Sequence, residues 1–223
     1  MRRRLPPCLL VVALVGAGCG NDPVERGDLR AAEKPTRLLS TSYPDAGAKF
    51  EAPEGWRRAE GTLPRVVTFS SGEAVLAIFA YRRKEPSPPE AEALGRARKR
   101  LVRQARRRDK NFKIRKAQNT KVAGRPAIEI TGTQTIGGVT LETRSVHVFK
   151  KGGEYVFEAL APAGQFRLLD ASVVTPLLKS LKVTGKVKRS PREELERKRR
   201  EAKEKRERKK QDEDGGDQPD QRR

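Results

Sequence analysis

Two pairs of adjacent glycines in the second half of the chain constrain the fold more than any other feature. Gly137-Gly138 separates the strand-like runs 127–136 and 139–150, and Gly152-Gly153 separates the second run from 155–160. Glycine adopts the left-handed backbone conformations of tight hairpin turns, so two glycines between such runs are typical of a hairpin. The sequence therefore predicts consecutive antiparallel strands here.

Two stretches with helical periodicity flank these strands. Residues 89–108 begin with proline and glutamate, which suit the first turn of a helix, and carry one apolar stripe. The stripe consists of Leu94, Ala97, Leu101 and Ala105. Residues 166–180 show a second helical pattern, in which Pro176 predicts a break and Thr175 a cap for the last turn.

Further strand-like runs complete the predicted sheet. Three of them, 36–43, 66–69 and 74–81, precede the first helix, and two more follow it at 112–116 and 181–183. The run 74–81 is apolar at odd and even positions alike, so we expect it to be covered on both faces. The predicted fold class is α+β, an antiparallel β-sheet flanked by helices.

The N-terminal residues resemble the signal of bacterial lipoproteins. Arg2–Arg4 precede the uncharged run 9–17, which is shorter than the roughly 20 apolar residues that span a bilayer. Small residues then lead to Cys19, as in the lipobox, where the cysteine sulfur receives a diacylglycerol. The resemblance implies a signal peptide over 1–18, export, and anchoring to the extracytoplasmic face of the cell membrane. Gly16 stands where the family usually has leucine, so an ordinary secretory signal and an uncleaved anchor remain alternatives.

Composition divides the remaining chain into three parts. Residues 19–35 are polar and aperiodic and are predicted to be a flexible tether. Residues 36–185 hold the predicted sheet and its helices and are long enough for one hydrophobic core. Residues 186–223 form a charged tail, predicted to be helical to about residue 210 and then disordered. A capping box of Ser190 and Glu193 marks the start of that helix.

The chain is strongly basic, with a formal net charge of +21. Such a charge favours negatively charged partners, namely anionic lipids, envelope polymers or nucleic acid. An export signal and an aromatic content of 5% make nucleic acid the weakest of these. The candidate anionic-surface residues on helix 89–108 are Arg96, Lys99, Arg100, Arg103 and Arg107. A soluble helix face without function is the alternative interpretation.

The order of elements and several short motifs resemble the Mog1/PsbP-like domain of bacterial lipoproteins. The motifs are Phe50…Pro53-Glu54-Gly55-Trp56, Gly124-Arg125-Pro126-Ala127, and Tyr155–Pro162 with the later Phe166 and Leu178–Val183. The resemblance covers residues 36–185. It implies an α/β/α sandwich with a non-catalytic binding or assembly role, as in members linked to photosystem assembly, a small GTPase or envelope partners. None of their sites maps onto this chain, and no cofactor is predicted.

His147 is the single histidine of the chain. If both glycine pairs close two-residue hairpins, Ile128 and Glu158 flank His147 on one face of the sheet. A His147–Glu158 pair is either a proton-responsive element or a structural cross-strand contact. One histidine without a usable thiol does not make a zinc site, so no metal ligands are predicted.

These observations predict an exported, lipid-anchored binding or assembly protein rather than an enzyme. Its expected partners are the membrane, through the diacylglycerol on Cys19, and an envelope protein or anionic envelope component. The alternative is a structural protein that holds anionic lipid or polymer through helix 89–108 and the tail. No catalytic residue is predicted, because nucleophile, phosphate-loop and dinucleotide motifs are absent from the sequence. A hydrolase would require an open pocket that holds His147, Glu158 and a free hydroxyl together.

Overall fold

The computed structural model describes residues 31–83, 91–136, 138–150 and 152–214. In chain order the elements are β1 (Leu38–Tyr43), β2 (Ala48–Pro53), β3 (Arg57–Glu60), β4 (Arg65–Ser71), β5 (Ala74–Arg82), α1 (Ala91–Arg108), β6 (Lys113–Val122), β7 (Arg125–Ile136), β8 (Val139–Lys150), β9 (Gly153–Pro162), α2 (Ala163–Leu169), the π-helical turn η1 (Asp170–Val174), α3 (Thr175–Ser180), β10 (Lys182–Val183) and α4 (Pro191–Asp214).

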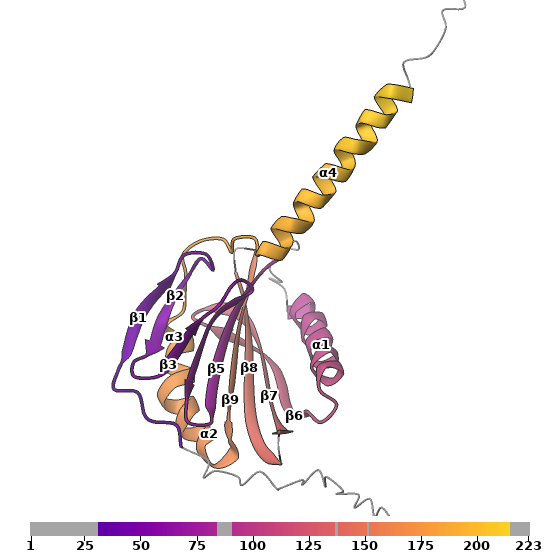
Figure 1. Ribbon diagram of the computed structural model, residues 1–223. Coiled ribbons are helices and arrows are strands. Elements are labelled where there is room, and N and C mark those ends of the chain that lie inside the picture. The colour runs from indigo at the N-terminus through magenta and orange to yellow at the C-terminus, as the bar shows by residue number, and fades with distance from the viewer. Residues whose placement is uncertain (1–30, 84–90, 137, 151, 215–223) are drawn as a thin grey trace, which may run out of the picture.

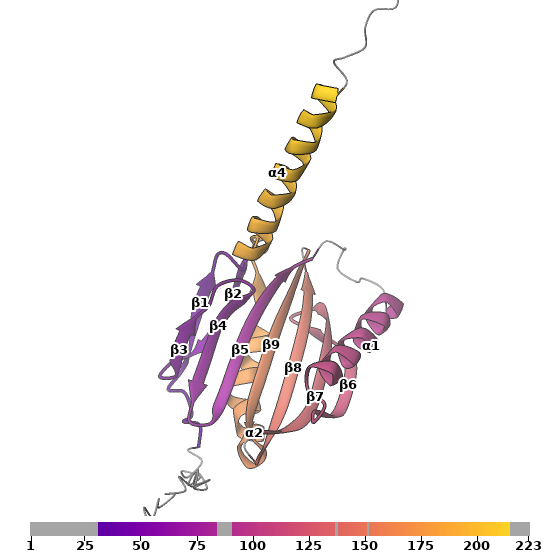
Figure 2. The same cartoon turned by 45° about the vertical axis from the view of Figure 1, so that its right-hand side comes forward.

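Within the described residues the strands form two antiparallel sheets. The larger has the order β3-β4-β5-β9-β8-β7-β6, and the smaller has the order β1-β2-β10. Helix α1 lies on one face of the larger sheet, over β6 and β7, while α2, η1, α3 and the small sheet cover the other face (Figures 1 and 2). The predicted α+β class with an antiparallel sheet between helices is confirmed.

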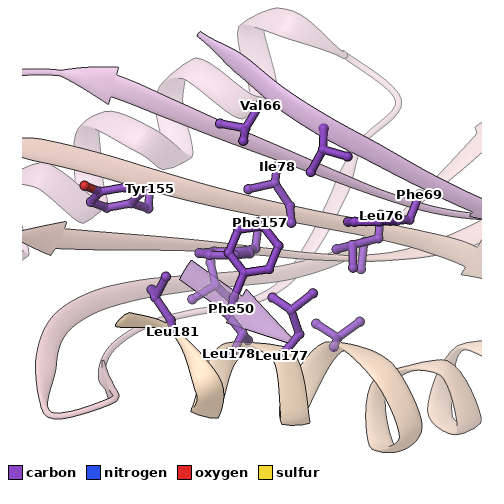
Figure 3. Packing of buried hydrophobic residues seen from close by; sticks show 14 of the residues in the cluster. Phe50, Val66, Phe69, Leu76, Ile78, Tyr155, Phe157, Leu177, Leu178 and Leu181 are labelled. Carbon is purple, nitrogen blue, oxygen red and sulfur yellow. The ribbon is translucent and has the colours of Figure 1, made fainter. Parts of the chain in front are cut away.

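The main core fills the space between the larger sheet and the layer of α3 and β2. Phe50 of β2 meets the ring of Phe157 of β9 edge to face at 6.0 Å between centroids, and Leu177 and Leu178 of α3 pack beneath them (Figure 3). Each such side chain contributes about 1.5–3 kcal/mol when it is fully buried. Trp56 also belongs to this core, and its indole nitrogen donates a hydrogen bond to the carbonyl oxygen of Glu33 at 2.9 Å.

The first predicted hairpin is confirmed, and the second is displaced by one residue. Ile136 pairs with Val139, which leaves the two-residue loop that the first glycine pair predicts. In the second hairpin Lys150 pairs with Gly153, so Gly153 belongs to strand β9. Gly153 is there for packing, because a Cβ on it would lie 3.0 Å from Val187 Cγ2 and 3.1 Å from Tyr155 Cε2. Because of this displacement, each residue of β8 lies opposite a residue of β9 that is two positions earlier than predicted.

Strand β5 is fully covered on one face only, so the prediction of two covered faces is wrong. Its buried face carries Ala74, Leu76, Ile78 and Ala80. On the other face Phe79 is half-buried and stacks on Tyr81, which is 42% exposed. Helix α1 lies over the opposite edge of the sheet and does not reach β5 (Figure 2).

The predicted break near Pro176 is also wrong, because the helical path continues through a wider turn. The N–H of Thr175 donates to the carbonyl oxygen of Asp170, five residues earlier, and Thr175 itself has helical dihedral angles. Pro176 then occupies the first turn of α3, directly after this wider turn.

Helix α4 projects from the domain (Figure 1) and begins with the predicted capping box. The N–H of Ser190 donates to Glu193 Oε2 at 2.8 Å, and the N–H of Glu193 donates to Ser190 Oγ at 3.3 Å. Val187, just before the helix, is buried in the main core. The 24 residues of α4 correspond to about 36 Å of helix.

Candidate functional site

A groove of about 400 Å³ opens between α1 and the face of the sheet formed by β7, β8 and β9. Its apolar lining is Leu101, Ala105, Phe112, Ile130, Ala159 and Leu160. Its polar lining includes Gln104, Arg108, Gln134, Ser145, His147 and Glu158. The groove lining therefore combines apolar side chains with hydrogen-bonding and charged ones, which is the usual character of a ligand site.

The groove follows from how α1 meets the sheet. Near the start of α1, Leu94 and Ala97 pack in a second core cluster with Ile128, Ile130 and Phe149. No space is left there between the helix and the sheet. The apolar stripe predicted from the sequence is thus the face that α1 buries. Further along, the short side chains of Ala105 and Ser145 leave space between helix and sheet, so the contact opens into the groove.

Two side chains of the groove lining, Ser145 and His147, form a hydrogen-bonded chain with Glu154 of β9. Ser145 Oγ lies 3.2 Å from His147 Nε2, and His147 Nδ1 lies 2.8 Å from Glu154 Oε1. The other carboxylate oxygen, Glu154 Oε2, accepts a hydrogen bond from Arg83 Nη1 at 2.7 Å. The side chains of His147 and Glu154 are 12% and 14% exposed, so both are largely shielded from water.

The carboxylate of Glu154 remains charged in this setting. Burial by itself raises the pKa of Glu154, but the hydrogen bond and charge of His147, and then those of Arg83, outweigh burial and lower the pKa. A charged carboxylate only accepts hydrogen bonds, so Nδ1 of His147 carries the proton. In the neutral ring, Nε2 then accepts the hydrogen bond of the Ser145 hydroxyl.

The predicted His147–Glu158 pair is wrong. His147 lies opposite Ile128, as expected on one side, but opposite Val156 on the other, and Glu158 lies opposite Ser145. The displaced second hairpin is the reason. Glu158 Oε1 instead accepts hydrogen bonds from Arg108 at 3.2 Å.

Sequence reasoning missed Ser145 and Glu154, although one signal was available. Ser145 and His147 are two residues apart in a strand, so their side chains must share a face. The role of Glu154 depends on the hairpin register. The resulting groove holds His147, Glu158 and the Ser145 hydroxyl together, which is the arrangement that a hydrolase would require.

The five candidate anionic-surface residues lie on the outer side of α1, and all are exposed: Arg96, Lys99, Arg100, Arg103 and Arg107. At 100° per residue they fall within about 120° of the helix circumference, on the side away from Leu101 and Ala105. Arg96 pairs with Glu92. Within the described part of the chain the other four have no acidic partner.

The candidate lipid attachment site, Cys19, lies outside the described residues. Of the predicted tether, residues 31–35 are described, and there the N–H of Glu33 donates to Ser71 Oγ at 2.9 Å. Among the residues that the structure describes, no helix is both long and apolar enough to cross a membrane. In the same residues no three potential metal ligands gather as a metal site requires.

Comparison with known proteins places the fold. No family model matches the chain, and none of the curated proteins does. Among solved structures, cyanobacterial PsbP (CyanoP) from Synechocystis superposes with a TM-score of 0.52 at 14% identity, over 70% of this chain and 96% of that one. The described domain has the Mog1/PsbP-like fold.

Two further structures are similar to this Mog1/PsbP-like domain at lower TM-scores. LpqN of Mycobacterium tuberculosis, which is involved in cell envelope biogenesis, gives 0.46 at 15% identity, over 67% of this chain and 91% of that one. The Ran-binding protein Mog1p of Saccharomyces cerevisiae gives 0.45 at 8% identity, over 68% and 96%. At such identities the similarity concerns the fold alone.

Proposed function

We propose that this chain is an exported, lipid-anchored protein of the cell envelope that binds an amphipathic envelope component in the α1 groove. The observation that carries the proposal is an open groove whose lining holds both apolar side chains and charged and hydrogen-bonding ones. An apolar group of the ligand fits against Leu101, Ala105 and Ile130, and a polar group fits near Gln104 and Arg108. Binding requires no reaction.

The N-terminal residues support the anchor, and the fold shows where the chain that leads from Cys19 meets the domain. Ala32 contacts Gln165 of α2, at the end of the domain opposite to α4 (Figure 1). A lipid on Cys19 would therefore be joined to the domain at its α2 end. Two acyl chains provide stable anchoring where one is marginal. Incorporation of labelled fatty acid, with Cys19→Ala as the control, tests the anchor: label that persists in Cys19→Ala contradicts it.

Groove binding is tested by filling the groove. Ala105 is a half-buried residue of the lining, and Ala105→Trp places a large side chain in the space that the ligand would occupy. Ala202, exposed on α4, provides the matched control Ala202→Trp. The full chain is used to capture partners from detergent-solubilised envelope.

We expect Ala105→Trp to reduce capture of a defined envelope component at least tenfold, while Ala202→Trp captures as the parent chain does. An apolar contact also persists at raised salt, whereas binding through counterion release weakens steeply. Equal capture by the two variants would contradict the groove as the binding site.

A second candidate function is attraction of α1 to an anionic lipid or polymer surface. It is favoured by the four exposed cations on α1 without an acidic partner in the described residues, Lys99, Arg100, Arg103 and Arg107. Each basic residue near a charged bilayer contributes about 1 kcal/mol. This surface lies on the opposite side of α1 from the groove, so the two functions are compatible.

Vesicle flotation tests this candidate. Replacing Arg100, Arg103 and Arg107 by Gln is expected to weaken binding to anionic vesicles by about 3 kcal/mol, or roughly a hundredfold. The control replaces Arg199, Arg206 and Arg208 of α4 by Gln, which removes the same charge from another exposed helix. Equal losses in both sets would assign the attraction to net charge and not to α1.

A further inference from the structure

The chain Ser145–His147–Glu154 ends in a hydroxyl inside the groove, and it has the connectivity of a nucleophile, a base and an orienting acid. We propose that Ser145 is a nucleophile for acyl transfer from carboxylic esters, with His147 as its general base and Glu154 as the positioning residue. This inference goes beyond binding. It replaces the expectation of a purely non-catalytic domain.

The geometry provides the first requirement, a base held within reach of the hydroxyl. His147 Nε2 is 3.2 Å from Ser145 Oγ, and Glu154 fixes the ring from the other side at 2.8 Å. Arg83 holds the second oxygen of Glu154 at 2.7 Å, so the carboxylate itself is fixed in orientation. When His147 takes the proton of the hydroxyl, the adjacent Glu154 carboxylate stabilises the resulting imidazolium.

The groove provides the second requirement, a place for the acyl group. Ser145 lies in register between Ile130 on β7 and Glu158 on β9. The apolar residues Leu101, Ala105 and Ile130 line the same groove, so an apolar acyl chain fits on that side of the hydroxyl. The ester alcohol then lies on the side of Glu158 and Arg108.

The third requirement is a set of donors for the oxyanion, and here they must be side chains. The backbone of β8 around Ser145 is paired with β7 and β9, so its N–H groups are used within the sheet. The side-chain amides of Gln104 and Gln134 line the groove and have no hydrogen-bond partner among the described residues. Arg108, held on Glu158 opposite Ser145, adds a positive charge to the groove lining.

The reaction balances with water as the second substrate. Ser145 Oγ forms a bond to the acyl carbon, the bond from that carbon to the alcohol oxygen breaks, and the hydroxyl proton passes through His147 Nε2 to the leaving alcohol. Water then attacks the acyl-serine, gives its proton to His147, and releases the carboxylic acid as the serine hydroxyl re-forms. No oxidant, metal or cofactor takes part.

The test uses the full chain, a fluorophosphonate probe with mass spectrometry, and hydrolysis of p-nitrophenyl butyrate. We expect a probe adduct on Ser145, and a loss of about a hundredfold or more in ester turnover in Ser145→Ala and in His147→Gln. Glu154→Gln is expected to lower kcat at least tenfold with little change in KM, as a positioning residue would. Ser172→Ala, which removes a hydroxyl bonded to the carbonyl of Leu168, is the control and should behave as the parent chain.

Two results would overturn the proposal: no adduct on Ser145, or ester turnover that survives in Ser145→Ala. Because Ser145→Ala removes one hydroxyl, thermal unfolding is expected to show a folded variant, and the loss of turnover then reports on chemistry. Capture of an envelope component requires no reaction at Ser145. We therefore expect Ser145→Ala to capture the envelope component, whereas Ala105→Trp does not. Capture thus tests binding in the groove, and ester turnover tests the reaction at Ser145, so either proposal can fail without the other.

Discussion

At the scale of single residues, Gly47 allows the turn after β1 to contact the segment before α4 closely. Gly47 has a positive φ of 59°, and a Cβ on it would lie 2.6 Å from the backbone carbon of Gly185. Its carbonyl oxygen accepts hydrogen bonds from the N–H groups of Thr184 and Gly185 at 2.8 and 3.1 Å. The turn after β1 thus binds the segment that leads to α4.

We therefore expect Gly47→Ala to destabilise the fold by about 2 kcal/mol or more, because a left-handed backbone strain adds to a backbone overlap. Gly55→Ala is the matched control, since φ there is +86° but a Cβ would meet nothing within 4 Å. Its expected cost is about 1 kcal/mol, from strain alone. Urea unfolding measures both, and equal losses would contradict the overlap.

Glu154 gives the second prediction at this scale, a dependence of stability on pH. Because the pKa of Glu154 is lowered from its ordinary value of 4.5, its contribution is present above that pH and is lost as pH falls through the folded-state pKa. At neutral pH Glu154→Gln is expected to cost about 2 kcal/mol, since it removes charged hydrogen bonds to His147 and Arg83.

The measurement is the free energy of unfolding of the parent chain and of Glu154→Gln as a function of pH. We expect the difference between them to narrow as pH falls below about 4.5, because the unfolded chain protonates Glu154 there while the folded chain binds the proton only at lower pH. Glu158→Gln is the comparison, since Glu158 pairs with Arg108, whose side chain is 71% exposed. A difference that stays constant from neutral to acidic pH would count against the ionic role of Glu154.

At the scale of elements, α1 and α4 are both basic helices on the surface, but they are held differently. Helix α1 buries Leu94 and Ala97 against the sheet, so packing stabilises it. Helix α4 has no such contact along most of its length and depends on its cap and on pairs such as Arg197 with Glu194 and Glu201. Exposed pairs of this kind contribute little each, because water screens the two charges.

The cap of α4 is therefore expected to have a measurable effect on helix content. Ser190→Ala removes the acceptor for the Glu193 N–H and is expected to destabilise the helix by about 1 kcal/mol. Far-UV circular dichroism should show a loss of helix, and Ser190→Asp, which keeps a capping oxygen, should restore it. Unchanged helix content in Ser190→Ala would show that the side-chain pairs suffice.

At the scale of the whole molecule, the compact domain ends just before α4. Lys188 Nζ pairs with Asp45 Oδ1 at 2.6 Å, and its backbone N–H donates to the Asp45 carbonyl oxygen at 2.9 Å. Val187 is buried beside Gly153. The linker 184–190 is thus part of the packed structure, and α4 extends from it.

Two truncations test this boundary. A chain that ends at Ser190 is expected to unfold within a few degrees of the full chain, because it keeps Val187 and the contacts to Asp45. A chain that ends at Val183 loses these contacts and is expected to be about 2–3 kcal/mol less stable. Thermal unfolding of both compares them directly, and equal midpoints would place the boundary before residue 184.

The sequence determined the features that depend on near neighbours. The period of Leu94, Ala97 and Leu101 identified α1 and its buried face, and Gly137-Gly138 fixed the register of β7 with β8. Ser190 with Glu193 identified the start of α4. Each of these is set by residues a few positions apart, where spacing alone specifies geometry.

Only the tertiary structure decided what depends on distant residues. Gly153 belongs to β9 because Val187 packs against it, and that contact moved Glu158 away from His147 and brought Glu154 to it. Helix α1 likewise packs over β6 and β7, and this position leaves β5 half-covered and opens the groove. The position depends on packing between elements that are distant in the sequence. Local sequence patterns do not predict these arrangements, because the free energy that selects them comes from contacts between residues that are far apart in the sequence.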